Sequence, residues 1–306
     1  MRQALAAGLL SFVACAHAFA ADSHDAQVVD ELRARWDRNR SAIQTAVIEY
    51  RSVHRPAQPQ RKYDDVSALL AKTPLVNNDE AIKNFIVSLD TTLKGQKELW
   101  SFKVFQTDGT DRRIDSTNGG TTSTHMLVGD NEVLANPRNR QIDLCLREKS
   151  RRHLSSIGEF NCIPSPSFLQ DATVTHSKRV LPLANVTLSS RGEEVVVEKE
   201  SGFVIEHRRG SPHSRCCIET IQYRPTKHEG DVLLPSVVFT GRYRMGMLEV
   251  FTLTIIDGAT INEPVYPDAF VVSAAKGDVV VDRRDGELST TELTEGIYDV
   301  LSYQVR

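Results

Sequence analysis

The residue types that most often do chemistry are scattered along this chain. No spacing typical of a serine nucleophile elbow, a zinc protease or a phosphate-binding glycine loop occurs in it. The run His213-x-x-Cys216-Cys217 resembles half of a metal site, but no second half of matching spacing exists. The run Asp108-Gly109-Thr110-Asp111 resembles a calcium loop, but Gly119 stands where that loop needs an acid. We therefore predict a protein that is not an enzyme and that has no metal and no cofactor.

The remaining chemical candidates are cysteines and a basic cluster. Cys145 and Cys162 bound a short loop, and a disulfide between them would stabilise the fold by about 3 kcal/mol. Cys216 and Cys217 are neighbours on a predicted strand, so their side chains should point to opposite faces rather than bond each other. The cluster His207-Arg208-Arg209 with His213 and Arg215 could bind an anionic head group or a phosphate, but a charged hairpin end is the simpler explanation.

The N-terminus has the features of a secretory signal peptide. A single early charge, Arg2, is followed by the apolar run from Ala4 to Ala16 and by Ala18-Phe19-Ala20. The run is shorter than the about 20 apolar residues of a membrane span. We predict cleavage after residue 20 and export to the periplasm or cell envelope. In an alternative interpretation, Phe12-Val13-Ala14-Cys15 approximates a lipobox, which would anchor the chain through lipid at Cys15.

The composition excludes two classes of partner. The 306 residues carry a net charge of −3. Removal of residues 1–20 takes away one base and no acid, so 36 basic and 40 acidic side chains remain, a net charge of −4. This is not the basic surface that nucleic acid requires. No other apolar run approaches a membrane span, so no transmembrane segment is expected in the mature chain. The oligomeric state is left open.

The elements that must position these residues are two helices followed by many strands. Apolar residues at helical spacing predict a helix over 25–47 and a second one from Asn78, with Ile82 and Phe85 on its apolar face. The proline-bearing stretch 56–61 between them is predicted to be a polar connector. Alternation of apolar and polar residues begins at Trp100, is interrupted by an irregular segment over 149–170, and resumes over 173–282.

Hairpins dominate the second half of the chain. Ser201-Gly202 and Met245-Gly246 each lie between two runs of strand-forming residues. Consecutive hairpins make an antiparallel meander, which must curl to limit its exposed edges. The predicted fold is therefore mainly β with two helices, a curved antiparallel sheet that forms a half-open β-barrel covered by helices.

A set of apolar residues at period two on three strands could line a hydrophobic-ligand cavity or fill a closed core. We predict a bulge or a longer loop beside the Met245-Gly246 turn, which brings both Phe239 and Phe251 to the concave face. The predicted cavity residues are Trp100, Phe102, Val104, Phe239, Tyr243, Phe251, Leu253 and Ile255.

Three segments carry a family resemblance. They are residues 36–50, Glu200-Ser201-Gly202-Phe203, and Ile261-Asn262-Glu263-Pro264 through Phe270 to Val281-Asp282-Arg283. With them the chain resembles the lipoprotein carrier superfamily, that of the periplasmic lipoprotein chaperone and its outer-membrane acceptor. More narrowly, it is similar to uncharacterised exported proteins of planctomycete-type bacteria.

The resemblance implies a half-barrel over residues 21–285, followed by a polar tail over 286–306 that the family does not need. It also implies a binding protein for a hydrophobic ligand, such as an acyl chain, a lipid or an acylated protein. The alternative is a structural or interaction module of the cell envelope with a closed core.

Overall fold

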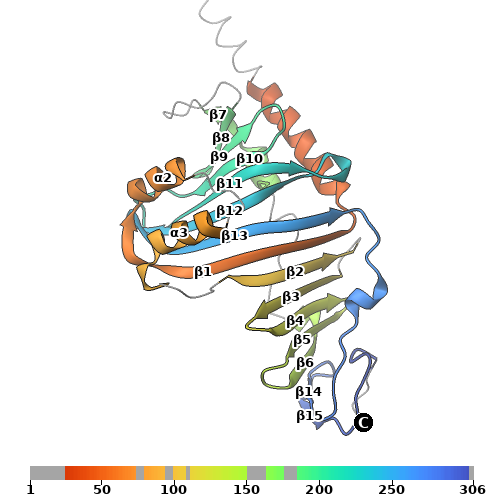
Figure 1. Cartoon of the computed structure of the whole chain (residues 1–306). Helices are drawn as coiled ribbons and strands as arrows, with labels where there is room; N and C mark the ends of the chain where they lie inside the picture. Colours follow the sequence, from red (N-terminus) through yellow and green to blue (C-terminus); the bar gives the residue numbers. More distant parts are fainter. Residues whose placement is uncertain are drawn as a thin grey trace, which may run out of the picture.

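The protein is described here from a computed structural model, which covers residues 25–73, 79–93, 99–107, 111–149, 163–175 and 185–302. The predicted signal peptide and Cys15 lie outside these residues. One curved sheet of fifteen strands dominates, in the order β15-β14-β6-β5-β4-β3-β2-β1-β13-β12-β11-β10-β9-β8-β7 (Figure 1). The order does not return on itself, so the sheet is unclosed. The predicted mainly β fold with a curved, open sheet is confirmed.

The strands of the first half are β1 Ala46–Lys62, β2 Trp100–Gln106, β3 Arg112–Asn118, β4 Thr121–Val128, β5 Asn131–Asn136, β6 Gln141–Leu146 and β7 Thr173–Thr175. Those of the second half are β8 Asn185–Ser190, β9 Glu193–Glu198, β10 Val204–Arg209, β11 Cys217–Lys227, β12 Leu233–Arg244, β13 Met247–Ile261, β14 Val279–Asp282 and β15 Ser289–Glu292. All neighbouring pairs are antiparallel except β6 and β14, which are parallel. The parallel pair was not predicted, because its two strands are more than a hundred residues apart in sequence.

Strand β1 is the centre of the sheet and defines its two faces. It pairs with β2 on one side and with β13 on the other. Successive side chains of a strand point to opposite faces. Val47, Glu49, Arg51 and Val53 therefore share one face, and Ala46, Ile48, Tyr50 and Ser52 share the other.

Two short helices cover the first of these faces. They are α2, Tyr63–Lys72, and α3, Asp79–Leu89. Both lie over β1, β13 and β12 on the same side of the sheet (Figure 1). We call this side the α2–α3 face. Helix α3 buries Ile82, Phe85, Ile86 and Leu89, the apolar stripe that the sequence predicts.

The opposite face holds the N-terminal helix, which is described over residues 25–42. It ends five residues before the predicted boundary, and Ala46 already belongs to β1. Its buried Trp36 and Leu32 belong to a cluster that includes Leu188 of β8, Val195 of β9 and the short helix α5, Pro166–Gln170. The indole Nε1 of Trp36 donates a hydrogen bond to the carbonyl oxygen of Gly202 at 2.7 Å. Two of the segments that carry the family resemblance therefore touch each other.

The stretch 56–61 is not a connector, which corrects the prediction. It completes β1, and its pairing with β13 jumps from Pro56↔Val250 to Arg61↔Leu248. Pairing of β1 with β2 has already ended at Ser52. Prolines that lack an N–H donor are tolerated at such a bulge, because no ladder hydrogen bond is required there. The stretch that resembles a loop in sequence is thus the last part of β1, and α2 follows it directly.

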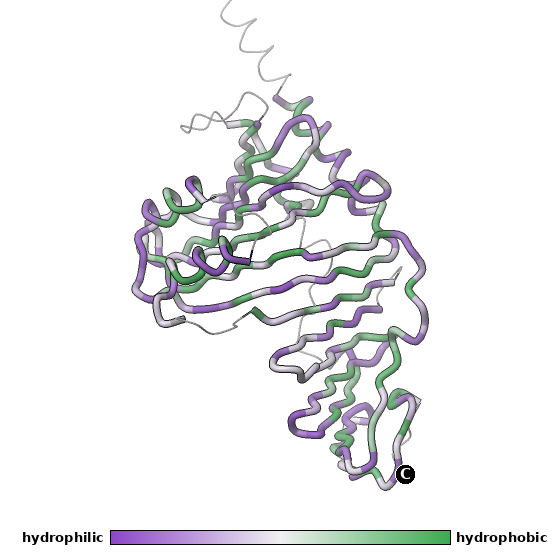
Figure 2. Tube along the Cα trace, in the orientation of Figure 1, coloured by the Kyte–Doolittle hydropathy of each residue, from purple (hydrophilic) through white to green (hydrophobic). Residues whose placement is uncertain are grey.

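The C-terminal segment packs on the sheet as well. Residues 262–278 run from the end of β13 along the molecule to β14 (Figure 1). Leu293 and Val300, from the stretch predicted as a polar tail, are buried with Met126 of β4 and Leu144 of β6. Figure 2 shows hydrophobic and hydrophilic residues alternating along many of the strands, as expected when each face has its own environment.

Candidate functional site

Most of the predicted cavity residues lie in a closed cluster on the α2–α3 face. Its members include Phe239, Tyr243, Phe251, Leu253 and Ile255, each 0% exposed. The ring of Phe85 from α3 meets that of Phe239 edge-on, with centroids 5.8 Å apart. In the part of the chain that the structure describes, these side chains are packed so closely that none of the five keeps exposed surface.

The predicted bulge beside the Met245-Gly246 turn is present. Pairing of β12 with β13 shifts between Arg242 and Tyr243. Phe239 then faces Leu253, and Gly241 faces Phe251, so both phenylalanines point to the same side of the sheet. The ring of Tyr243 occupies the space over Gly241, where an added Cβ would meet the ring at 2.8 Å.

The other three predicted cavity residues lie on the opposite face, which corrects the prediction of a single cavity. Trp100, Phe102 and Val104 pair with Ser52, Tyr50 and Ile48 of β1. Trp100 is 42% exposed, Phe102 stacks on Tyr50 with centroids 4.8 Å apart, and Val104 is buried in a separate cluster with Ile48. The period-two pattern was real on each strand, but the register places the strands' apolar sides on different faces. A ligand-binding role for either group stays a prediction.

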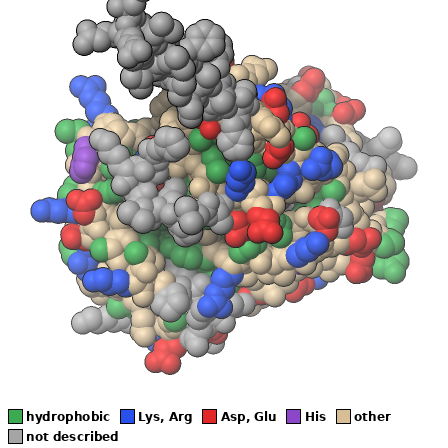
Figure 3. Space-filling view, turned by 90° about the horizontal axis from the view of Figure 1, so that it is seen from above, with side chains coloured by type: hydrophobic (Ala, Val, Ile, Leu, Met, Phe, Trp, Pro, Cys, Tyr) green, Lys and Arg blue, Asp and Glu red, His purple; other side chains and the backbone are tan. Residues whose placement is uncertain are grey.

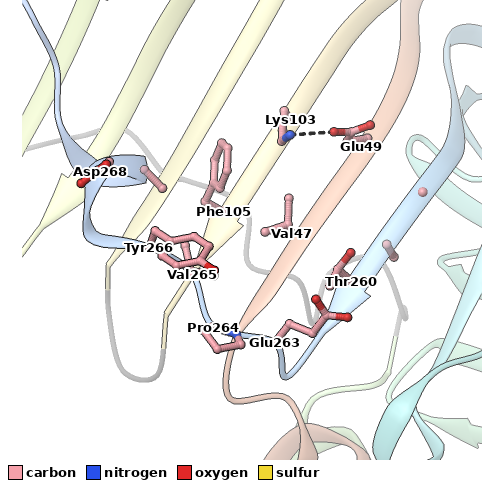
Figure 4. Close-up of a pocket in the computed structure, with 13 residues that line it drawn as sticks. Val47, Glu49, Lys103, Phe105, Thr260, Glu263, Pro264, Val265, Tyr266 and Asp268 are labelled. Carbon is pink, nitrogen blue, oxygen red and sulfur yellow. Dashed lines mark ion pairs between the residues drawn. The ribbon is translucent and has the colours of Figure 1, made fainter.

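An open groove lies on the α2–α3 face next to the closed cluster. Its volume is about 690 Å³, and Figure 4 shows the residues that line it. Its floor is formed by Val47 and Glu49 of β1, by Lys103 and Phe105 of β2, and by residues 258–260 near the end of β13. Its wall is the segment from Glu263 to Ala269. The Lys103 ammonium forms an ion pair with Glu49 at 2.7 Å, drawn as the dashed line in Figure 4.

Arg51 separates the groove from the closed cluster. It is the next residue after Glu49 on the same face of β1. Its Nε and Nη2 donate to the two carboxylate oxygens of Asp257, both at 2.8 Å, and its Nη1 donates to Asp79 at 2.7 Å. The hydrogen bond to Asp257, followed by that to Asp79, raises the pKa of Arg51 despite partial burial. Since Asp79 is the first residue of α3, Arg51 joins this helix to the sheet.

The segment that walls the groove is fixed by its first residue. Asn262 has a positive φ of 62°. Its amide Nδ2 donates to the carbonyl of Ala42 at 2.8 Å, and its Oδ1 accepts from the N–H of Gln44 at 2.9 Å. Thr45 also donates to the carbonyl of Glu263 at 2.5 Å. The Asn-Glu-Pro sequence thus ties the end of the N-terminal helix to the start of the wall. Sequence reasoning singled out this motif but did not recognise it as part of a groove.

A second polar group lies buried under α2. The hydroxyl of Tyr63 donates to Oε1 of Glu219 at 2.5 Å, and Glu219 is 0% exposed. The other oxygen, Oε2, has no hydrogen-bond partner among the described atoms. Arg208 approaches Tyr63 Oη at 3.3 Å and forms an ion pair with Glu194. Burial first, and then the nearby Glu219 carboxylate, raises the pKa of the Cys217 thiol to about 11, so this thiol stays protonated at neutral pH.

The predicted basic cluster is largely neutralised. Arg208 pairs with Glu194, and Arg209 pairs with Glu193 at 3.4 Å. His207 Nε2 lies 2.9 Å from the same Glu193, but burial outweighs that hydrogen bond and lowers the pKa of His207, so we treat the contact as a hydrogen bond of neutral imidazole. The charges of Arg208 and Arg209 are therefore engaged within the sheet.

The cysteines follow the sequence expectation where the structure describes them. Cys216 is exposed and Cys217 is buried, as predicted for neighbours on one strand. Within the described ranges, no group of three or more His, Cys, Asp or Glu side chains is arranged to hold a metal ion. Cys145 Sγ donates to Glu132 at 2.9 Å. Cys162 lies outside the described residues, so a disulfide between Cys145 and Cys162 stays a prediction.

The molecular surface agrees with the near-neutral composition. Figure 3 shows Lys and Arg side chains interspersed with Asp and Glu side chains, in keeping with the net charge of −3. In the described part of the chain, no helix combines the length and the hydrophobicity that crossing a membrane requires.

No family model and no curated protein matches this chain. Solved structures to which it is similar include a LolA superfamily protein from Nitrosomonas europaea, with 7% identity, a TM-score of 0.41 and coverage of 78% of this chain and 97% of that one. A domain from Vibrio parahaemolyticus named for outer membrane lipoprotein sorting has 10% identity, a TM-score of 0.38 and coverage of 81% and 97%. A DUF1329 family protein from Desulfovibrio piger has 11% identity, a TM-score of 0.40 and coverage of 78% and 96%. Since these TM-scores are below 0.5, the fold assignment rests on the strand order and register of this chain, and the narrower likeness to planctomycete proteins stays a prediction.

Proposed function

We propose that this chain is an exported, non-enzymatic binding protein for an amphiphile, such as a lipid, a free acyl chain or an acylated protein. The observation that carries the proposal is the position of the groove. It opens on the α2–α3 face next to Arg51, which pairs with the first residue of α3, and the apolar cluster under the helices continues beyond Arg51. An apolar chain that enters the groove would pass along the odd-numbered residues of β1 towards that cluster.

Admission of the chain requires α3 to move. The contacts that hold this helix of eleven residues include one apolar stripe, the ion pair from Asp79 to Arg51, and a hydrogen bond from Arg61 Nη2 to the carbonyl of Ser88 at 2.9 Å. The Asp79 side chain is 79% exposed, so this ion pair contributes at most about 1 kcal/mol. The apolar contacts of Phe85 and its neighbours are worth more, but an acyl chain would replace them at about 0.8 kcal/mol for each buried CH₂ group. The free energy lost when α3 leaves the sheet could therefore be offset by the burial of an acyl chain in its place.

The experiment measures displacement of a fluorescent fatty acid from the purified protein and, in parallel, identifies co-purified lipid by mass spectrometry. Asp79→Asn removes the ion pair with Arg51 while leaving the apolar stripe, and it should speed uptake of the probe. Asp30→Asn is the matched control, because the ion pair of Asp30 with Arg33 lies at the exposed surface of the N-terminal helix. Absence of co-purified lipid together with absence of probe binding in both variants would refute the proposal.

Export is tested separately by N-terminal sequencing of the protein recovered from the cell envelope. A mature chain that begins at Ala21 supports cleavage after residue 20. A chain that retains Met1 contradicts export, and a lipid-modified Cys15 would establish the anchored form.

The second candidate is an interaction module with a permanently closed core. Complete burial of Phe239, Phe251 and Leu253 favours it, because a side-chain-filled interior offers an apolar ligand no volume. Two results for the Asp79→Asn variant would favour this candidate: the variant binds no probe, and the backbone amide hydrogens of its α3 exchange with solvent as slowly as in the unaltered protein.

A further inference from the structure

We propose that the groove selects amphiphiles whose polar end carries a positive charge, such as an ammonium group. This inference rests on the proposed function, since it names the chemical class of the ligand's head group. It is carried by three features of the groove wall: two carboxylates that have no counter-charge among the described residues, an exposed tyrosine ring between them, and a backbone that is held in place.

The ionisable residues of the groove are unbalanced. Its lining contains Glu49, Glu263 and Asp268 against a single base, Lys103, a net charge of −2. Lys103 is already paired with Glu49. Glu263 and Asp268 are exposed, and neither forms an ion pair within the described residues. A cationic head group would supply the missing counter-charge, whereas a phosphate or sulfate would be repelled.

Among the described residues, Arg51 and Arg113 are further cations near the groove, and both are engaged, Arg51 by Asp257 and Asp79. The Nε of Arg113 donates to both carboxylate oxygens of Asp115, at 2.9 and 3.0 Å. Its Nη1 donates to the carbonyls of Ala269 and Val271, at 2.8 and 3.1 Å. The Arg113 guanidinium therefore holds the wall in place, and Asp115 compensates its charge.

An aromatic ring lies between the two unpaired carboxylates. Tyr266 is 75% exposed and makes no ring contact or side-chain hydrogen bond within the described ranges. Aromatic faces attract ammonium groups through the ring quadrupole. Phe105 in the same groove shows this attraction: Lys103 Nζ lies 5.4 Å and Arg113 Cζ 5.8 Å from its centroid. The face of Phe105 is thus used by the protein's own cations, while that of Tyr266 is open to a ligand.

The segment that forms the groove wall is already held in one conformation before a ligand binds. Pro264 and Pro267 fix two backbone φ angles near it, and the N–H of Ala269 donates to the carbonyl of Tyr266 at 2.9 Å. Asn262 and Thr45 hold the start of the wall, and Arg113 holds its end. Binding to a preorganised site avoids the entropy cost of immobilising a loop. Carboxylates and ring are therefore presented together as a site.

The test compares three ligands that share a twelve-carbon tail: dodecyltrimethylammonium, dodecyl maltoside and dodecyl sulfate, each titrated below its micelle concentration by calorimetry. Two uncompensated charges and one aromatic face should make the ammonium ligand bind about tenfold tighter than the sulfate at low salt. That preference should shrink in Glu263→Gln/Asp268→Asn and on raising the salt concentration. The control Glu287→Gln/Glu295→Gln removes the same charge from exposed positions outside the groove and should leave the preference unchanged.

Each outcome decides one of the two proposals. If none of the three ligands binds, the proposed amphiphile function fails. If the three bind equally, or the sulfate binds best, the function stands and the head-group inference is overturned. If the ammonium ligand is preferred but the control variant abolishes the preference as strongly as the groove variant, the selectivity comes from net charge alone and the site is not the groove.

Discussion

Removal of one hydroxyl under α2 should reveal how this helix is held to the sheet. The hydroxyl of Tyr63 donates to a carboxylate oxygen of Glu219 at 2.5 Å, and neither side chain is more than 5% exposed. A hydrogen bond to a charged group contributes about 1.5–3 kcal/mol, and loss of a buried partner adds the desolvation cost of the group left behind. The other oxygen of Glu219 makes no hydrogen bond in the described part of the chain. We expect Tyr63→Phe to lower the free energy of unfolding by about 3 kcal/mol.

The substitution keeps the ring, so its edge-on contact with Tyr243 at 5.0 Å should survive. The assay is urea unfolding followed by far-UV circular dichroism, with Tyr266→Phe as the matched control. That hydroxyl is at the surface, and its loss should change stability by less than about 0.5 kcal/mol. If Tyr63→Phe is as mild as Tyr266→Phe, the Glu219 carboxylate does not depend on Tyr63, and the reasoning is refuted. If Tyr63→Phe costs nothing further when combined with Glu219→Gln, the two side chains are confirmed as one interacting pair.

Three further predictions concern packing and ionisation. Gly241→Ala would place a methyl group 2.8 Å from the ring of Tyr243 and should cost about 1–3 kcal/mol in urea unfolding, whereas Gly258→Ala, with nothing within 4 Å, should be near neutral; equal effects would contradict the packing described for Gly241. The raised pKa of Cys217 means that the folded state favours the protonated thiol, so the free energy of unfolding should be constant below about pH 9 and fall as the pH rises towards 11. Cys217→Ala should remove this fall, and an unchanged alkaline profile in the variant would contradict the assignment to Cys217. Burial lowers the pKa of His207, so the folded state favours neutral imidazole and stability should fall as pH drops below the unfolded value of 6.5; His207→Gln should flatten this acid limb in thermal melts, and an unchanged limb would exclude His207 as its source.

The repeating patterns of the sequence determined most of the local structure. Alternation of apolar residues predicted β2 to β6 and the hairpin of β12 and β13, since a half-buried strand must alternate. The Met245-Gly246 turn forms because both residues have positive φ, 52° and 77°, as a two-residue hairpin turn requires. The bulge beside it and the apolar stripe of α3 followed from the same local rules. These features depend on neighbours in sequence, so the sequence alone contains their cause.

The tertiary structure decided which of these elements face each other. Alternation assigns two sides to every strand, but it does not say which side faces which. The register does: Trp100 pairs with Ser52 of β1 and Phe251 with Arg55, and these two β1 residues point to opposite faces. The prolines of 56–61 resemble a loop in sequence, and only the sheet shows that this stretch pairs with β13 across a bulge after the pairing with β2 has ended. Tyr63 and Glu219 are 156 residues apart, and the groove combines β1, β2 and the segment after β13. No local pattern encodes such contacts, because their energy arises only when distant segments exclude water from one another.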